Sequence, residues 1–203
     1  MGKPSRTKDD LRSPPPNSSP SRKGSLRINS DDQRGTAMTE TVAQDIQRLE
    51  EQERLLRFIR FSPNDAWALG NQLRETALSI GAGVAIDISL RDRVLFHCAL
   101  PGTNTDNVEW IRRKRNTVFR LWHSSYLVGR RLALSGRGQE EAHNLPLTDF
   151  AVHGGGFPLF VADLGCVGAV TVSGVPQRVD HAIVTDAIAA FLKVDLGDSR
   201  LPD

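Results

Sequence analysis

Two pairs of apolar, strand-like runs constrain the fold of this chain more than any other feature. The first pair comprises residues 84–88 and 94–98, and the second comprises residues 158–162 and 166–172. Within each pair the connection is only a few residues long, whereas a parallel crossover needs roughly a dozen or more. Each pair is therefore predicted to be an antiparallel hairpin.

Apolar residues at helical spacing surround the two hairpins. An amphipathic lead-in helix is predicted within residues 38–57, and the next helix should begin at Pro63, behind Ser62 as its N-cap. Further helices are predicted over residues 106–122, 125–134 and 180–192. This order of elements predicts an α/β (α+β) chain with a mainly antiparallel sheet covered by helices.

The ends of the chain differ in composition from this central region. Residues 1–37 are rich in Ser, Pro and charged residues and carry eight Lys or Arg against four Asp, so we expect a disordered basic tail. Since the whole chain has a formal charge of +2, the rest is close to −2, which favours neither nucleic acid nor membranes as partners. We expect the folded domain over residues 58–194 and a short C-terminal tail over residues 195–203.

Cellular location is predicted from what the sequence lacks. No apolar stretch reaches the roughly 18–20 residues that span a bilayer, and no apolar block follows the N-terminal charges as in a secretory signal. We therefore expect a cytoplasmic protein. Cys98 and Cys166 each lie inside an apolar run, without a CxxC spacing, and are predicted to be buried, reduced thiols.

The most unusual local sequence is the glycine loop, His153-Gly154-Gly155-Gly156-Phe157-Pro158. Consecutive glycines allow a backbone to approach a ligand or to adopt positive φ, and their N–H groups can form an anion-binding nest. Alternatively, the glycines form a tight bend into a strand, with Pro158 at a sheet edge where its missing donor is harmless. The residues alone leave both interpretations open.

A run of four basic residues, 112–115, lies on a predicted helix. Because successive residues are about 100° apart on a helix, the run forms a solvated surface rather than one basic face. Lys114 differs from its neighbours, since it lies one turn from Trp110 and from Val118 on an apolar strip. We expect its side chain to reach into a cleft. The following Ser124-Ser125 pair is predicted to cap the next helix.

Asp180 and His181 stand near the start of the last predicted helix. Asp180 is a plausible N-cap, or the two residues form a polar pair where the helix dipole favours an anionic ligand. The five histidines show no strong zinc spacing, and no nucleophile elbow is present, so no catalytic residue is assigned.

Taken together and in order, these motifs resemble the HbpS-like family, which includes GlcG-type proteins and the C-terminal domain of PduO. The chain looks like a subgroup of small, stand-alone cytosolic proteins with no settled activity. The resemblance covers about residues 56–194. It rests on Lys114 followed by Thr117, the glycine loop, the closing strand at residues 167–174, and Asp180-His181.

The resemblance implies an α-β-α sandwich with a five-stranded antiparallel sheet, a homo-oligomer, and haem or another small ligand bound near the glycine loop. His153 is then the preferred axial ligand to haem iron, and His181 is the second choice. Lys114 would pair with a propionate. The remaining candidate binding residues are Gly154, Gly155, Gly156 and Asp180.

Three functions follow from these expectations. The first is a haem-binding or haem-handling module. The second is a non-catalytic homo-oligomeric scaffold or adaptor, and the third is an enzyme acting on a small anionic metabolite through Lys114, the glycine N–H groups and His153. All pocket assignments require that the lysine-bearing helix, the glycine loop and the Asp-His pair border one hollow.

Overall fold

The computed structural model describes residues 30–202, with the backbone alone for residues 30–37. The prediction of a disordered tail therefore lies outside the described residues for positions 1–29. The lead-in helix α1, Ser30–Leu55, begins eight residues earlier than the boundary expected at residue 38. Its sequence from Ser30 onward contains no proline, so nothing in the backbone chemistry stops the helix at that boundary.

The sheet has four strands in the order β2-β1-β4-β3, and every pair is antiparallel. The strands are β1 (Ala85–Leu90), β2 (Val94–Ala99), β3 (Gly156–Val161) and β4 (Gly165–Ser173). Both predicted hairpins, β1–β2 and β3–β4, are confirmed.

The expectation of a fifth strand is wrong. A single parallel bridge between Phe58 and Val161 occupies that place, beside the outer edge of β3. The physical reason is the shortness of the segment, because α1 ends at Leu55 and Ser62 already caps the next helix. The few residues between them make two backbone hydrogen bonds, from Phe58 N to Phe160 O and from Ala162 N to Phe58 O, each 2.8 Å.

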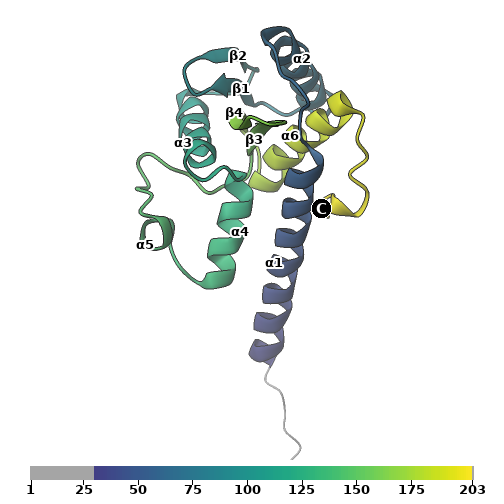
Figure 1. Ribbon diagram of the computed structural model, residues 1–203. Coiled ribbons are helices and arrows are strands. Elements are labelled where there is room, and N and C mark those ends of the chain that lie inside the picture. Colours follow the sequence, from purple (N-terminus) through teal and green to yellow (C-terminus); the bar gives the residue numbers. More distant parts are fainter. Residues whose placement is uncertain (1–29, 203) are drawn as a thin grey trace, which may run out of the picture.

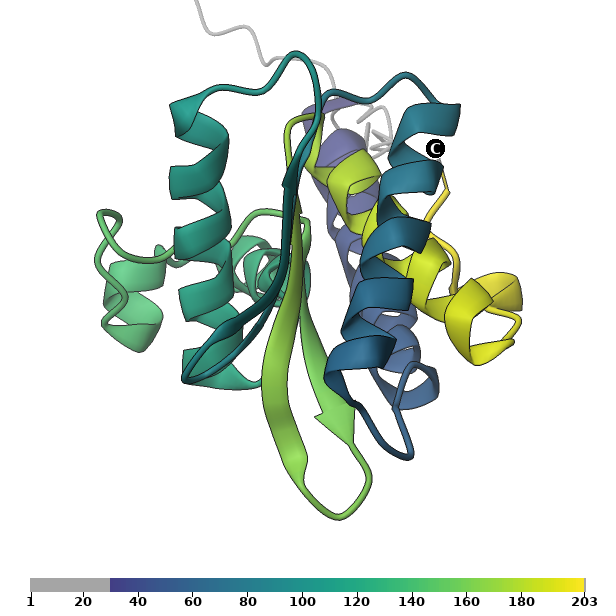
Figure 2. The same ribbon diagram turned by 90° about the horizontal axis from the view of Figure 1, so that it is seen from above.

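Helices cover both faces of the sheet, as expected for an α-β-α sandwich. On one side lies α3 (Thr105–Leu121), and on the other lie α2 (Pro63–Ser79) and α6 (Gln177–Leu192) (Figure 2). Helix α1 runs away from this body beside α4, Ser125–Ser135 (Figure 1). The short elements α5, Gln139–His143, and η1, Gly197–Ser199, were not predicted.

The helix starts test the capping predictions. Ser62 caps α2 with Pro63 in the first turn, and Asp65 completes a capping box, so this prediction is confirmed. Ser124 likewise caps α4 and accepts from Leu127 N. Asp180 is not an N-cap, because α6 begins three residues earlier, at Gln177 behind Pro176. Asp180 therefore lies inside the first turn, with its side chain free for another contact.

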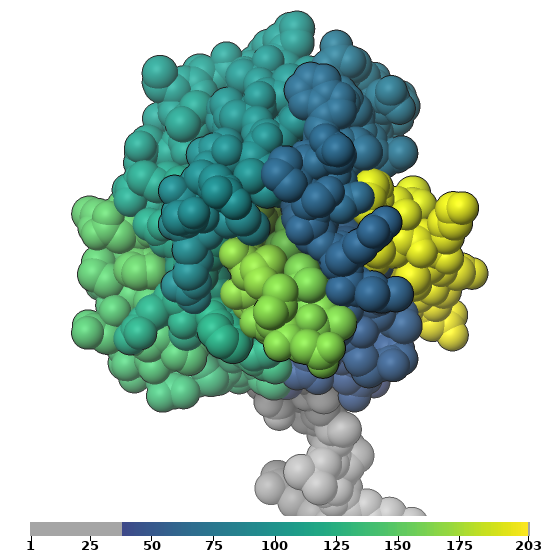
Figure 3. Space-filling model, turned by 45° about the horizontal axis from the view of Figure 1, so that its top comes forward, coloured from purple at the N-terminus to yellow at the C-terminus, as the bar shows by residue number. Residues whose placement is uncertain are grey.

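The main core lies between the sheet and the α2–α6 layer. Alternate residues of the central strands point into it, among them Ile86, Ile88, Val170 and Val172. The β3–β4 hairpin reaches the surface in yellow-green between the blue and teal parts of the chain (Figure 3). Within residues 30–202, no helix is long and apolar enough to cross a membrane.

Candidate functional site

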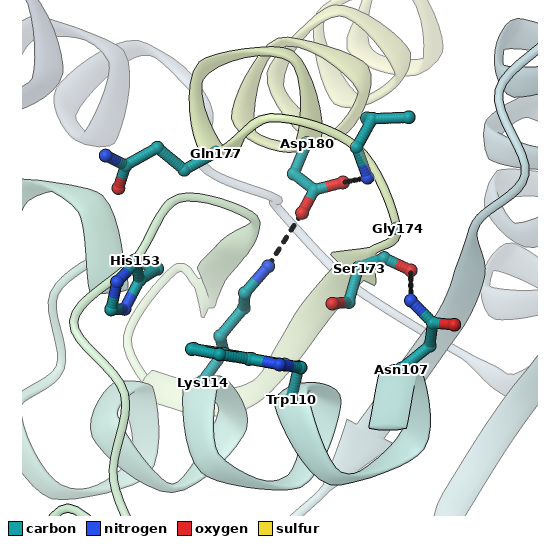
Figure 4. A pocket seen from close by; sticks show the side chains of 9 residues that line it. Asn107, Trp110, Lys114, His153, Ser173, Gly174, Gln177 and Asp180 are labelled. Atoms are coloured by element: carbon teal, nitrogen blue, oxygen red, sulfur yellow. Dashed lines mark hydrogen bonds and ion pairs between the residues drawn. The ribbon is translucent and has the colours of Figure 1, made fainter. Parts of the chain in front are cut away.

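A pocket of about 250 Å³ opens where α3, the end of β4 and the start of α6 meet (Figure 4). Its walls come from segments far apart in the sequence. They are Asn107, Trp110 and Lys114 of α3, His153 of the glycine loop, Ser173, Gly174 and Val175 after the core of β4, and Gln177 and Asp180 of α6. The predicted convergence of the lysine-bearing helix, the glycine loop and Asp180 is therefore found.

The floor of the pocket is a buried ion pair. Lys114 Nζ lies 2.8 Å from Asp180 Oδ2, and each residue is 2% exposed. The ammonium also donates to Val172 O at 3.0 Å, and Asp180 Oδ1 accepts from Val175 N at 3.1 Å. An ammonium has three N–H donors, and among the described residues only these two acceptors engage it, which leaves one donor for a ligand.

Burial dominates the electrostatics of this pair. Desolvation lowers the pKa of Lys114 and raises the pKa of Asp180, while the attraction between the two charges opposes both shifts. The pair links α3 and α6, which cover opposite faces of the sheet, around the end of β4. Lys114 thus reaches into a cleft, as its position on an apolar strip predicted.

The glycine loop forms the wall behind the ion pair, and close packing explains two of its glycines. Gly155 has φ +110°, and a Cβ there would lie 2.9 Å from Lys114 Nζ and 3.0 Å from Asp180 Cβ. A Cβ at Gly154 would overlap the carbonyl oxygen of Gln177. The loop is therefore the tight bend into a strand, and it allows the backbone to approach the charged pair.

The alternative of an anion-binding nest is not supported. Gly154 N donates to Gln177 Oε1 at 3.4 Å, and Gly156 N donates to Ser125 Oγ at 3.0 Å, so these two N–H groups are already engaged. These bonds take up two of the three glycine N–H groups that the enzyme hypothesis assigned to the anion cradle. Pro158 does lie on an edge strand, as predicted.

Residues outside the pocket hold the loop in place. Ser125 Oγ donates to His153 O as well as accepting from Gly156 N. Thr117 Oγ1, one turn beyond Lys114, donates to Ala151 O at 3.0 Å. The two residues of the Lys114–Thr117 motif thus have different structural roles. Lys114 places its ammonium in the pocket, and Thr117 binds the segment that leads into β3.

The rim of the pocket is aromatic and cationic. The ring of His153 meets that of Trp110 edge to face, with centroids 4.9 Å apart, and the Arg113 guanidinium lies 4.0 Å from the Trp110 centroid. Partial burial lowers the pKa of His153, and the nearby charges of Lys114 and Arg113 add to the effect. The imidazole is exposed at the rim and is neutral at pH 7, so its lone pair is available.

His181 does not line this pocket, which corrects its assignment as a site residue. It points into the layer beneath α1, where its Nε2 lies 2.9 Å from Gln52 Oε1 and its ring lies near Tyr126 and Phe157. Since Gln52 Nε2 donates to Ser199 O, the amide oxygen faces His181, and Nε2 of His181 carries the proton. Complete burial lowers the pKa of His181 to about 3.

The basic run on α3 divides as its helical spacing predicted. Arg112 pairs with Glu109 and Asp149 at the surface, and Arg113 stacks on Trp110. Arg115 is a partial exception, because it is half-buried and reaches Asp87 Oδ1 at 3.2 Å on the sheet. The run therefore contains one buried cation, Lys114. The other three side chains contact the surface, the rim of the pocket and the sheet, respectively.

Sequence reasoning did not assign a site role to two residues that line the pocket, Asn107 and Gln177. Asn107 completes the capping box of α3 and also donates to Ser173 O at 3.4 Å. Its position three residues after Asn104 indicates the capping role, but nothing in the local sequence indicates its place in the pocket. Nothing in the local sequence marks Gln177, since its contact with the glycine loop depends on the tertiary fold.

Neither cysteine is part of the site. Both thiols are free; Cys166 is buried, and its pKa rises to about 11 because burial disfavours the thiolate. Cys98 is only partly buried, contrary to expectation, because β2 is an edge strand. Among the described side chains, no cluster of three or more His, Cys, Asp or Glu is arranged to hold a metal ion.

Comparison with known proteins identifies relatives of the whole folded region. Residues 61–189 match the family described as "Haem degrading protein HbpS-like". A UPF0303 protein of Rhizobium leguminosarum bv. trifolii is 47% identical over 161 residues, which cover 79% of this chain and 97% of that protein.

Two solved structures share the architecture. The structure of the Ybr137w protein has a TM-score of 0.68 and 29% identity, covering 73% of this chain and 87% of its own. A structure described as a PduOC:Heme complex has a TM-score of 0.57 and 19% identity, covering 65% of this chain and 95% of its own. At this identity, the second likeness shows the fold alone.

Proposed function

Because the chain belongs to the HbpS-like family, we propose that it is a small-ligand-binding module whose site is the pocket above the Lys114–Asp180 pair. The observation that carries this proposal is the buried ion pair at the pocket floor. A buried pair adds little stability compared with apolar side chains of similar volume. The free-energy cost of burying these two charges is better explained by a ligand that interacts with them, here through the third N–H donor of Lys114.

The lining indicates the chemistry of the ligand. Asn107 and Gln177 offer amides, Trp110 offers a flat apolar face, and Lys114 offers one donor. The volume of about 250 Å³ is below the ~300–1,000 Å³ of pockets for drug-sized ligands. A small polar molecule with a carbonyl or carboxylate acceptor fits these features, with the acceptor on Lys114 and its planar part against Trp110.

Haem is the ligand implied by the family, and the residues of this pocket do not fit it. A porphyrin needs an apolar slot, an axial ligand and cations for its propionates. His153 is neutral and exposed, which suits ligation, but Trp110 and Val175 are the main apolar lining. Lys114 keeps one free N–H donor, but a pocket of about 250 Å³ is too small to enclose a porphyrin. Haem held by a single chain would have to bind at the rim.

The proposal is tested by a thermal-shift screen of small carboxylates and amides against the wild type, Trp110→Ala and Asn107→Ala. A ligand of this pocket should raise the Tm of the wild type and raise that of both variants less. Trp67→Ala is the matched control, since Trp67 is an exposed tryptophan on α2, away from the pocket. Equal shifts in all four proteins would contradict the proposal.

A parallel haem titration separates the two ligand classes. Haem added to the wild type should leave the free-haem Soret band unchanged if the pocket takes only small polar molecules. A band that moves in the wild type and in His143→Ala, but not in His153→Ala, would instead favour haem ligation by His153. His143 is a suitable control because it is exposed on α5.

A homo-oligomer is a second proposal, and it is compatible with the first. Exposed apolar side chains favour it, among them Ile59 at 89% exposure. Large exposed apolar side chains gather at subunit contacts. Native mass spectrometry should give a mass above that of one chain, and Ile59→Asp should reduce it. A monomeric wild type would contradict this proposal and leave the ligand site untouched.

A further inference from the structure

A second hollow lies on the other side of α3, and it is lined by residues of the β1–β2 turn and of the end of that helix. It consists of two adjoining pockets of about 510 and 340 Å³, which share Arg91, Asn116 and Phe119. We call the two together the α3 groove. Its combined size falls in the range of small-molecule sites.

The larger end of the α3 groove is aromatic. Phe119, Trp122 and Phe150 line it, and Arg91 and Arg120 border it. Arg91 is fixed at the junction, because its NH2 donates to Phe119 O at 2.7 Å and its guanidinium lies 5.6 Å from the Phe119 ring centroid. Several N–H bonds of this guanidinium remain available to a ligand.

The smaller end is cationic. Arg93 and Arg115 line it together with the shared Arg91, so the whole groove has four arginines against one lining carboxylate, Asp92. Among the described residues, Arg91 and Arg120 have no carboxylate within ion-pair distance, whereas Arg115 is partly neutralised by Asp87. The groove therefore has an excess of positive charge next to an aromatic wall.

Trp122 ends α3 in the left-handed C-cap conformation, which Asn144 and Lys193 also adopt at the ends of α5 and α6. It is the C-cap of α3 with φ +60°, a left-handed position that glycine normally occupies and that a bulky side chain disfavours. Its side chain is 48% exposed, so burial does not compensate for this conformation. The indole of Trp122 lines the larger end of the groove.

We propose that the α3 groove binds a planar aromatic anion, with the ring system against Phe119, Trp122 and Phe150 and the acidic groups on the arginines. Aromatic faces stack on planar ligands, and guanidinium groups bind carboxylate, sulfonate and phosphate through paired N–H donors. This site is separate from the pocket above Lys114 and Asp180. It shares no lining residue with that pocket.

The test uses anilinonaphthalene sulfonate as the aromatic anion and phenylnaphthylamine as its neutral counterpart. We expect saturable, one-site binding of the sulfonate to the wild type, quenching of tryptophan fluorescence, and about tenfold weaker binding of the neutral compound. The variants Trp122→Ala and Arg91→Gln with Arg120→Gln should each weaken sulfonate binding by about tenfold.

Matched controls keep the result specific. Trp67→Ala with Arg74→Gln removes an exposed tryptophan and an exposed arginine from α2, and should bind the sulfonate like the wild type. Trp110→Ala should do the same, so the groove succeeds or fails independently of the proposed pocket. Arg120→Gln alone, at an exposed position, provides a folded variant if Trp122→Ala does not fold.

Three outcomes would overturn the proposal. The first is equal affinity for the charged and neutral compounds. The second is an equal loss of binding in the control variants. The third is a change of oligomeric state in Trp122→Ala without a change in sulfonate binding, which would make the groove a subunit contact instead.

Discussion

The two faces of the sheet bury different chemistry. Toward α2 and α6 the central strands present Ile86, Ile88, Val170 and Val172 to a continuous apolar core. Toward α3 the alternate positions of the same strands are mostly polar. They are Asp87 and Ser89 of β1 and Thr171 and Ser173 of β4, and His97 of the edge strand β2 lies beside Asp87.

The difference separates stability from function within one sheet. The apolar face is stabilised by burial of side chains, which is not directional and depends on area. The polar face depends on specific partners, such as Arg115 with Asp87 and Lys114 with Asp180. Both the proposed pocket and the α3 groove border α3, so both proposed sites lie on the polar side.

Removing one charge from the polar layer should have the largest effect. Lys114→Met leaves Asp180 buried without its partner, and we expect a loss of about 3–5 kcal/mol in the free energy of unfolding. The double variant Lys114→Met with Asp180→Leu should recover most of this loss. Denaturant unfolding of both variants measures it, and a double variant as unstable as the single one would show that the pair itself is not responsible.

His181 shows how the apolar side holds a titratable group, because it is kept neutral. Its pKa is about 3 in the folded protein and 6.5 in the unfolded chain, so the unfolded chain binds the extra proton as pH falls. Its contribution to stability is present above pH 6.5 and declines below it, by about 2 kcal/mol between pH 7 and 5. The free energy of unfolding of the wild type should fall more between pH 7 and 5 than that of His181→Leu, by this amount. If the free energy of unfolding had the same dependence on pH in both proteins, the prediction would be contradicted.

A small deletion in the apolar face should cost less. Ile88→Val removes one methylene from a fully buried position of β1 and should lower the free energy of unfolding by about 1 kcal/mol. Ligand binding in the pocket should be unchanged, since Ile88 points away from α3. A loss of binding in this variant would show that the two faces are not independent.

The smallest change should be in the opposite direction. Thr171 is fully buried on the polar face, and its Oγ1 has no hydrogen-bond partner among the described residues. Thr171→Val replaces this hydroxyl with a methyl group and should raise the free energy of unfolding by up to about 1 kcal/mol. A rise in Tm checks it, and a marked fall would indicate that the hydroxyl has a partner, such as a buried water.

The same comparison explains what the sequence could predict. The apolar face can be recognised in the local sequence. The strands are apolar runs, and α2 has apolar residues at helical spacing, namely Ala66, Leu69, Leu73 and Ala77. Both hairpins and most helices were therefore predictable from local patterns. The short connection within each pair of strands predicted that the pair is antiparallel. The fifth strand came from resemblance alone, and it failed where the segment at Phe58 is too short to pair further.

The polar face was only partly predictable, because its partners are distant in sequence. Lys114 was identified from its place on an apolar strip, but no local pattern marks Val172 O or Asp180 as its acceptors. His181 was misassigned because neighbours on a helix point in different directions, about 100° apart. Asp180 therefore faces the pocket while His181 faces α1.

The single bridge at Phe58 limits how this sheet can grow. Phe58 covers one end of the outer edge of β3, and Pro158 lacks a donor on the same strand, so the edge of β2 is the more available one for a further strand. Two copies that joined through β2 would use identical edges and would leave no further edge to extend. Such pairing would close at a two-fold dimer and would not allow open-ended, fibre-like stacking of sheets.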